Sequence, residues 1–413
     1  AGKDSQGRVK FEQWRLFQLA FILAQIPGFA SRVPDYASEF DPARDEETAS
    51  LLYFATGGGK SEAFFGAVVY LLIRYPLRLL TVQQARRLFR LLVHADLIRR
   101  THKVDGVPFQ LGFWVGSSNT PNVLTDDRVT GVPFSDTPPP KRRSKEDLKY
   151  QTIRRALNKV PTCPFCHEHT ELRRSEGLNN RNRLALMCLN EACKWNQETQ
   201  TDTFEPLPFL LVDEDIYARA PSIVLGTIDK LALIGQNDNT ISKVFGMFGL
   251  ARLKLDGLDR VAPPREAKQD SAPPGHSTLH PFYEDGEKLF LDPIPGLVIQ
   301  DEAHLLEESL GAFAGLFETT LEQVFRQNDE LYGDAVARHP DKDGQPGAPR
   351  MPKIVAATAT VSDPGRQTEI LYQRQCKQFP WPGPDLYESF YSQPKAPDDE
   401  NRNARLVDTG STE

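Results

Sequence analysis

The sequence has few cysteines and methionines, no long apolar run and no initiator methionine. Its 413 residues include five Cys and three Met. A membrane-spanning helix needs about 20 consecutive apolar residues, and the most apolar stretch, Phe17 to Phe29, is interrupted by polar residues and by Pro27. The first residues also lack the apolar core of a signal peptide. We therefore expect a cytoplasmic protein with no membrane partner and, because the chain starts with Ala1, a processed or excised piece of a longer one.

The net charge argues against a nucleic-acid ligand until its distribution is considered. The formal net charge is −7, yet residues 139–185 hold twelve Lys or Arg against five Asp or Glu. That segment carries +7, which leaves about −14 on the rest of the chain. A basic segment on an acidic body suits a polyanion-binding surface. The alternative is a solvated, flexible loop.

Apolar runs alternate with helical patterns along most of the chain. This alternation predicts an α/β fold, a parallel sheet with flanking helices, whose ligands bind where the strands end. The predicted strands are Leu51–Phe54, Leu77–Val82, Phe109–Val115, Ser222–Gly226, Gly296–Gln300 and Lys353–Ala357. The predicted helices include Glu12–Gln25, Ser61–Arg74, Gln83–Arg99, Leu305–Arg326 and Arg366–Gln375.

Two segments do not follow this alternation. Residues 122–207 hold the basic run and four of the five cysteines, and residues 256–295 are rich in Pro, Gly and charge. The first indicates an inserted zinc-ribbon subdomain, and the second a surface loop. We therefore predict a single α/β core in three parts, 1–121, 208–255 and 296–413, separated by these two segments.

The segment that runs from Phe54 to Ser61, FATGGGKS, predicts a phosphate-binding loop. It lies between a predicted strand and a predicted helix, the context that such a loop requires. Glycines let successive backbone N–H groups point at the phosphates, Lys60 would reach the β- and γ-phosphates, and Ser61 would hold Mg²⁺. Phe54 replaces the first glycine of the general pattern, so a plain glycine-rich turn is the alternative. The candidate residues are Thr56, Gly57, Gly58, Gly59, Lys60 and Ser61.

The segment Asp301-Glu302-Ala303-His304 follows an apolar strand and predicts the second half of the nucleotide site. Mg²⁺ prefers carboxylate and water ligands, so Asp301 can hold it. Glu302, on the other side of the chain, can orient and deprotonate the attacking water. A chance surface tetrapeptide would not explain the apolar strand before it.

Another predicted strand ends in Thr358-Ala359-Thr360. Two small hydroxyl residues at this place can hydrogen-bond to the catalytic carboxylates and couple the nucleotide state to a neighbouring surface. A plain strand end is the alternative.

Two cysteine pairs predict a structural zinc site. Cys163 and Cys166 form a C-P-x-C knuckle, and Cys188 and Cys193 follow after 21 intervening residues. Four thiolates in tetrahedral geometry suit Zn²⁺, and disulfides are not expected in a cytosolic chain. Two unligated pairs are the alternative. His167 and His169 are reserve ligands, and Cys376 stands alone.

Taken in order, these motifs resemble the first RecA-like domain of the superfamily 2 helicases, which has an upstream Gln, a T-G-x-G-K-[ST] loop, a D-E-x-[HD] box and a [ST]-A-T box. The resemblance implies that Arg15 and Gln18 read adenine, so that ATP is the nucleotide, and that Lys60, Asp301, Glu302 and His304 form the catalytic set. Strings at 74–84, 114–122 and 226–232 further resemble the helicase-subunit family of the DISARM anti-phage systems (DrmA). The nucleic-acid contacts that this implies are Arg78, Thr81, Gln83, Gln84, Ser117, Asn119, Thr227 and Lys230.

The same resemblance implies partners. Such helicases carry a second RecA-like domain with an arginine finger after the [ST]-A-T box, and only 53 residues follow Thr360 here. We expect a second RecA-like domain or a companion subunit to complete the site, and DNA, single-stranded or with an overhang, to be the track. A non-catalytic ATP-binding scaffold that carries a zinc ribbon is the alternative. A kinase or GTPase would leave the last two boxes without a role.

Overall fold

The structure is a computed structural model that divides into two compact units, which are described separately. Unit 1 comprises residues 1–69, 296–311 and 338–413, and unit 2 comprises residues 70–295 and 312–337. The residues that the structure describes are 16–32, 34–53, 63, 71–75, 78–104, 108–116, 119–135, 144–176, 182–198, 205–227, 230, 244, 251–255, 258–262, 283–284, 287–288, 292, 294–306, 308–332, 338–340, 345–358, 363–380, 393–394 and 407–408.

The sheet of unit 1 consists of four parallel strands. They are β1 (Thr48–Tyr53), β12 (Leu297–Gln300), β15 (Lys353–Thr358) and β16 (Gln375–Phe379), in the order β16-β1-β15-β12. Every residue of β12 and β15 is buried. Parallel strands covered on both faces are expected to be continuous apolar runs, as LVIQ and KIVAAT nearly are.

Helices cover the sheet of unit 1. Helix α1 (Leu16–Ala30) packs Phe21 edge-on against Phe379 of β16, with 5.4 Å between the ring centroids. Helix α12 (Pro364–Tyr372) contacts β1 and β16. It begins at an N-cap, Asp363, whose side chain accepts a hydrogen bond from a backbone N–H of the first turn, which satisfies one of the amide groups that a helix start leaves unpaired.

The sheet of unit 2 also has four parallel strands. They are β2 (Leu71–Tyr75), β3 (Leu111–Trp114), β6 (Phe209–Leu210) and β7 (Ile223–Thr227), in the order β2-β7-β3-β6. The strands β3, β6 and β7 are buried along their whole length.

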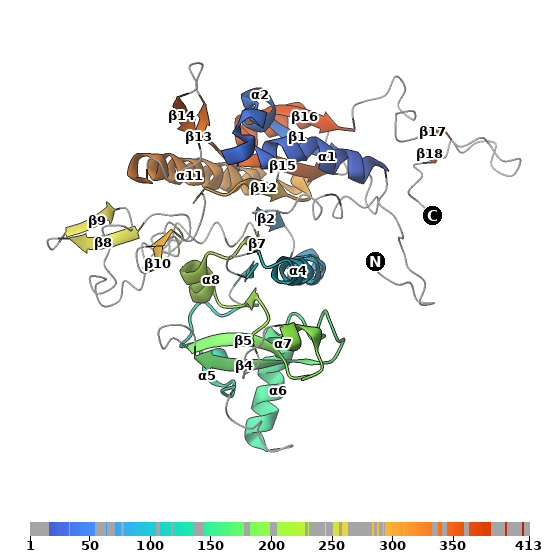
Figure 1. Ribbon diagram of the computed structural model, residues 1–413, viewed down its shortest axis with the longest axis vertical. Helices are drawn as coiled ribbons and strands as arrows, with labels where there is room; N and C mark the ends of the chain where they lie inside the picture. Colours follow the sequence, from blue (N-terminus) through green and yellow to red (C-terminus); the bar gives the residue numbers. More distant parts are fainter. Residues whose placement is uncertain are drawn as a thin grey trace, which may run out of the picture. The chain divides into compact units, whose positions relative to one another are not determined.

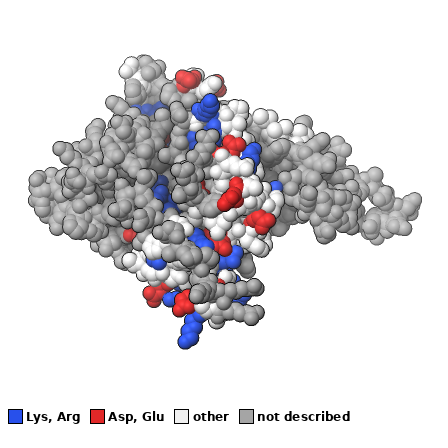
Figure 2. Space-filling view, turned by 60° about the horizontal axis from the view of Figure 1, so that its bottom comes forward, with Lys and Arg blue, Asp and Glu red and all other residues white. Residues whose placement is uncertain are grey.

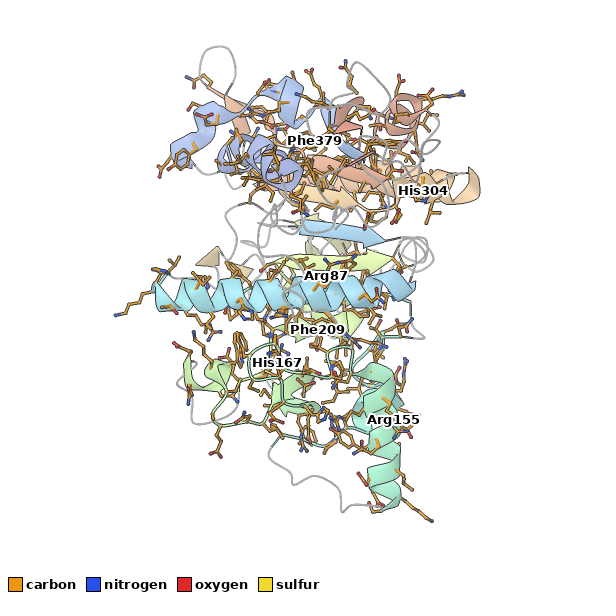
Figure 3. All side chains as sticks on the ribbon, turned by 90° about the vertical axis from the view of Figure 1, so that its right-hand side faces the viewer. Arg87, Arg155, His167, Phe209, His304 and Phe379 are labelled. Carbon is orange, nitrogen blue, oxygen red and sulfur yellow. The ribbon has the colours of Figure 1, made fainter. Side chains whose placement is uncertain are left out.

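Helices α4 (Arg78–Thr101) and α8 (Asp213–Arg219) lie on opposite sides of these strands (Figure 1). On the α4 side, Phe89 packs edge-on against Phe209, with the ring centroids 5.0 Å apart, and Figure 3 shows Phe209 next to this helix. On the α8 side, the indole N–H of Trp114 donates to the hydroxyl of Tyr217 at 3.0 Å. Successive strand residues point to opposite faces, so the apolar strands of unit 2 can hold a helix on each face.

The cysteine-bearing insertion belongs to unit 2 and is built on an antiparallel hairpin, β4 (Thr170–Glu176) and β5 (Asn182–Cys188). Helix α6 (Lys145–Leu157) packs its buried face, which includes Tyr150 and Leu157, against this hairpin, and the Tyr150 hydroxyl donates to the carbonyl of Leu172 at 3.0 Å. Two short helices, α5 (Asp127–Thr130) and α7 (Lys194–Glu198), complete it.

The remaining described elements are short, apart from α11. They are η1 (Pro34–Glu39), α2 (Pro42–Asp45), β8 (Ala251–Leu255), β9 (Leu258–Ala262), β10 (Tyr283–Glu284), β11 (Glu287–Lys288), η5 (Ala303–Leu305), α11 (Glu308–Tyr332), β13 (Arg338–Pro340), β14 (Pro346–Pro349), β17 (Gln393–Pro394) and β18 (Val407–Asp408). No helix among the described residues has both the length and the apolar character needed to span a membrane.

The predicted α/β class with parallel strands and flanking helices is confirmed, but one predicted strand is wrong. Residues 77–82 were expected to be a strand, whereas α4 begins at Arg78 and β2 lies earlier, overlapping the end of the predicted helix Ser61–Arg74. Periodicity alone cannot assign so short an apolar run to strand or helix. Pro76 cannot donate to a strand ladder, and the Arg, Leu and Gln residues after it are good helix formers. The five-part domain division stays a prediction.

Candidate nucleotide site and metal centre

The Asp301-to-His304 segment forms a tight turn at the carboxyl end of β12. The Asp301 side chain is almost fully buried and accepts a hydrogen bond at 3.0 Å from the backbone N–H of Glu302. Glu302 has a left-handed backbone (φ 50°, ψ 48°) and starts the short helix η5. A non-glycine residue in this region costs about 1–2 kcal/mol, and such strain clusters at functional sites. Two acidic residues are thus held in a fixed turn at a strand end.

The same turn is tied to β15 and α12. His304, labelled in Figure 3 where the chain leaves β12, has its Nδ1 atom 3.5 Å from Glu302 Oε2 and 3.3 Å from the hydroxyl oxygen of Thr358. The Gln367 amide of α12 donates to the carbonyl of Ala303 at 2.9 Å. Strands β12 and β15 pair in parallel, with Gln300 opposite Ala356, and this register brings the two motifs together.

The first half of the predicted nucleotide site falls largely outside the described residues. This applies to Arg15, Thr56, Gly57, Gly58, Gly59, Lys60, Ser61 and Thr360. Gln18 is described: it lies on the buried face of α1 in unit 1. The Asp301 carboxylate is an oxygen ligand of the kind that Mg²⁺ prefers, so the described part of the site is compatible with that metal.

The predicted nucleic-acid residues lie in three places of unit 2. Gln83 and Gln84 are in the first turns of α4, where Gln83 is exposed and Gln84 is buried and accepts from Arg87 at 3.4 Å. Thr227, the last residue of β7, is fully buried, and its hydroxyl has no hydrogen-bond partner among the described residues. Asn119 is half-buried in the loop after β3. The side chains of Arg78 and Thr81 and all of Ser117 lie outside the described residues.

Lys230 is buried in unit 2 by contacts with two residues, Asp213 and Asn122, that the sequence alone did not connect with it. Its ammonium group forms a buried salt bridge with Asp213 and donates to the Asn122 side chain at 3.1 Å. Burial raises the pKa of Asp213 to about 6, although the charge of Lys230 opposes the rise. Because burying two charges is tolerated only when they are paired, this contact explains the low exposure of Lys230 without a nucleic-acid ligand.

The four paired cysteines converge on one point. Their sulfur atoms all lie within 4.8 Å of one another, with 3.8 Å between Cys163 and Cys193 and 3.5 Å between Cys166 and Cys188. A tetrahedral zinc with Zn–S bonds of about 2.3 Å separates its sulfurs by about 3.8 Å. The cysteine cluster therefore fits Zn²⁺, and His167 and His169 are exposed and outside it.

Backbone hydrogen bonds and turns hold the four cysteines in the positions that bring their sulfur atoms together. In the knuckle, the N–H of Cys163 donates to the carbonyl of Glu168 at 2.8 Å, and His167 takes the left-handed backbone (φ 63°). At the other pair, the Asn196 amide donates to the carbonyl of Cys188 at 2.9 Å. Burial raises the pKa of the Cys163 thiol to about 11. Metal binding must therefore displace the thiol protons, and metal affinity falls as the pH is lowered.

An aromatic stack fastens the cysteine cluster to α4. Phe165 of the knuckle stacks on Trp195 of α7, with ring centroids 5.8 Å apart and planes 13° from parallel. The guanidinium of Arg100 lies 4.8 Å from the Trp195 ring centroid, and the His94 ring lies 4.9 Å from that of Phe165. Both Arg100 and His94 are on α4, so the metal-binding end of the insertion packs directly on the helix that covers the sheet of unit 2.

Comparisons with known proteins bear on the class of this chain. No family model matches it. DISARM protein DrmA from Bacillus paralicheniformis (strain ATCC 9945a / NCIMB 11709 / CD-2) is 29% identical over 410 residues, which cover 92% of this chain and 32% of DrmA. The chain thus spans about a third of the length of this curated relative. A crystal structure of the DUF1998 helicase MrfA bound to DNA covers 90% of this chain and 28% of its own, at 12% identity and a TM-score of 0.32, which is too low to support an argument.

Fold and side-chain geometry define the class first: an α/β protein with parallel strands, flanking helices and a cysteine cluster suited to zinc. The particular likeness is to DrmA, and the resemblance predicted from the sequence is confirmed.

The buried pair generates a first prediction. Replacing Lys230 by Met leaves the Asp213 carboxylate buried without a cation, which we expect to lower the free energy of unfolding by about 3–5 kcal/mol. Urea unfolding measures it. Lys194→Met, at an exposed position of α7, is the control and should change stability by less than about 0.5 kcal/mol. Unchanged stability together with weaker nucleic-acid binding would show that Lys230 is a ligand contact instead.

The cysteine cluster generates a second prediction. The purified chain should hold one zinc ion per molecule, measured by plasma emission spectrometry, and Cys163→Ser should lose it and unfold the insertion, because structural zinc contributes on the order of 10 kcal/mol. Cys376→Ser changes a cysteine of β16 outside the cluster and should keep the metal. Stoichiometric zinc in Cys163→Ser, or none in the unmodified chain after growth with zinc, would contradict the assignment.

Proposed function

We propose that the chain is the first RecA-like domain of an ATP-dependent nucleic-acid motor, directed at DNA and acting in a DISARM-like anti-phage defence complex. The observation that carries the proposal is the contact between His304 and Thr358, at 3.3 Å, which joins two helicase-type motifs at the ends of adjacent parallel strands. The resemblance to DrmA supports the defence context.

The roles follow from the chemistry of the residues. Lys60 and the glycines at 57–59 would bind the phosphates of ATP, and Ser61 and Asp301 would hold Mg²⁺, which neutralises phosphate charge. Glu302 would accept the proton of the attacking water. These groups and Gln18, the proposed adenine reader, all belong to unit 1.

Coupling between ATP hydrolysis and nucleic-acid binding would use His304, the last residue of the Asp301-to-His304 turn. His304 contacts both Glu302 and Thr358, so a change at the carboxylate reaches β15 through one side chain. Thr358, with Thr360, would pass that change to the neighbouring RecA-like domain, which would supply the cation that completes the site. Hydrolysis therefore requires that second domain or a companion subunit.

The proposal is tested on the full-length protein or complex, with ATP hydrolysis measured with and without single-stranded DNA. Glu302→Gln keeps the size of the side chain but removes the base, so we expect kcat to fall about 10²- to 10⁴-fold while ATP binding is retained. Glu369→Gln, at an exposed position of α12 in the same unit, is the matched control and should keep the unmodified rate.

The same experiment separates the motor from the scaffold alternative. Lys60→Ala should abolish ATP binding if the phosphate-binding loop is intact. ATP binding with no hydrolysis in any assembly would favour a non-catalytic scaffold. Equal rates for Glu302→Gln and the unmodified protein would remove Glu302 from the mechanism and overturn the proposal.

A further inference from the structure

Helix α6 has one buried face and one exposed basic face. Tyr150, Ile153 and Leu157 are buried against the insertion. The opposite face exposes a row of side chains: Lys145, Lys149, Thr152 and Arg155. Figure 3 shows Arg155 on this helix. In Figure 2, Lys and Arg side chains project at the lower edge of the molecule, beside acidic ones. At 1.5 Å per residue, the helical part of the row, from position 145 to position 155, is about 15 Å long.

The row continues onto α4 at the end of α6. Lys159 follows the helix, and its ammonium group donates to the carbonyl of Ala156 at 2.6 Å. Arg86 of α4 donates through Nε to the carbonyl of Lys159, also at 2.6 Å. Each bond uses one of several N–H donors, so both cations keep donors for another acceptor. Burial and the charges of Arg86 and Arg128 lower the pKa of Lys159, as expected where cations gather.

Among the described residues, no carboxylate forms an ion pair with Arg86, Lys149, Arg155 or Lys159, whereas Arg128 is paired with Asp126 at 2.8 Å. Uncompensated cations placed in a row suit a ligand that is itself a row of anions. The sugar–phosphate backbone is such a ligand, because duplex DNA carries a charge about every 1.7 Å of its axis.

The chemistry of this row favours phosphates over bases. Its exposed groups are ammonium, guanidinium and hydroxyl, the groups that contact phosphate oxygens. Recognition of unpaired bases uses aromatic platforms. Among the large apolar side chains exposed in the described part of the chain, Tyr36 is the aromatic one, and it belongs to unit 1. An acidic peptide would also need apolar anchors, and Leu148 is the one large apolar side chain that α6 exposes.

We propose that the basic row, defined as Lys149, Arg155 and Lys159 together with Arg86 of α4, binds the nucleic-acid backbone without reading sequence and seats the track on the insertion. The proposal rests on the proposed function, since it takes nucleic acid as the ligand. It also gives the cysteine cluster a role, because a zinc ion bound there would hold the hairpin on which α6 packs.

The inference is tested by fluorescence anisotropy with a labelled 20-nucleotide DNA strand and a 20-base-pair duplex, at 50 to 200 mM salt. The double variant Lys149→Glu/Arg155→Glu changes exposed side chains, and we expect it to bind at least tenfold more weakly. The slope of log affinity against log salt should become shallower by about 0.7 per lost contact for the single strand and about 0.9 for the duplex. Lys159→Gln should act in the same direction.

Controls separate this loss from misfolding and from failure of the proposed function. Lys194→Glu reverses an exposed charge elsewhere on the insertion and should leave affinity and slope unchanged, and zinc content should be equal in all variants. Unmodified protein that binds neither nucleic acid overturns both this inference and the nucleic-acid part of the proposed function. Binding that the double variant retains with the same affinity and salt slope overturns this inference alone.

Discussion

The parallel pairing of β12 with β15 is the constraint on which the candidate nucleotide site depends. Both strands run in the same direction and end at the same edge, and Gln300 lies opposite Ala356. The two strand ends therefore meet at His304, whose Nδ1 atom lies 3.5 Å from Glu302 Oε2 and 3.3 Å from the Thr358 hydroxyl oxygen. A shift of one residue would turn these side chains to the other face of the sheet.

The left-handed backbone at Glu302 is tolerated because the turn is held on both sides. The Asp301 side chain accepts a hydrogen bond from the backbone N–H of Glu302. The side-chain amide of Gln367, a residue of α12, donates a hydrogen bond to the carbonyl of Ala303. Ala303 itself packs with Leu51 and Ala356 in a small apolar cluster. Packing and hydrogen bonds thus hold a conformation that the isolated tetrapeptide would rarely adopt.

Burial divides the lysines and arginines of unit 2 into two roles. Lys230 is enclosed and must keep Asp213 and Asn122 as partners, because an unpaired buried charge is costly. Lys149 and Arg155 lie on the outside of α6, where water solvates them and no partner is required. Arg100 is intermediate: it pairs with Asp96 at 2.8 Å and also lies over Trp195. Similar cations therefore serve as internal ties or as a surface for anions, according to the element that carries them.

The sequence predicts a candidate site correctly where the residues that form it lie within a short motif. The spacing of the cysteines indicated a zinc site, and the four sulfurs converge as expected. The apolar strands before Asp301 and Thr358 were also predictable, because buried parallel strands are continuous apolar runs. The strand expected at Leu77–Val82 failed for the converse reason, since an equally apolar segment can begin a long helix.

Residue types and their local spacing determined the α/β class, the metal ligands and the order of the motifs in this protein, because turns, strands and knuckles depend on near neighbours. Tertiary structure alone decided which distant groups meet. Lys230 finds Asp213 and Asn122, and Phe165 stacks on Trp195 over α4, across separations in sequence that no local pattern reports. These tertiary contacts determine which side chains are buried. Burial in turn decides whether a charged side chain pairs inside the protein or stays exposed to solvent and ligands.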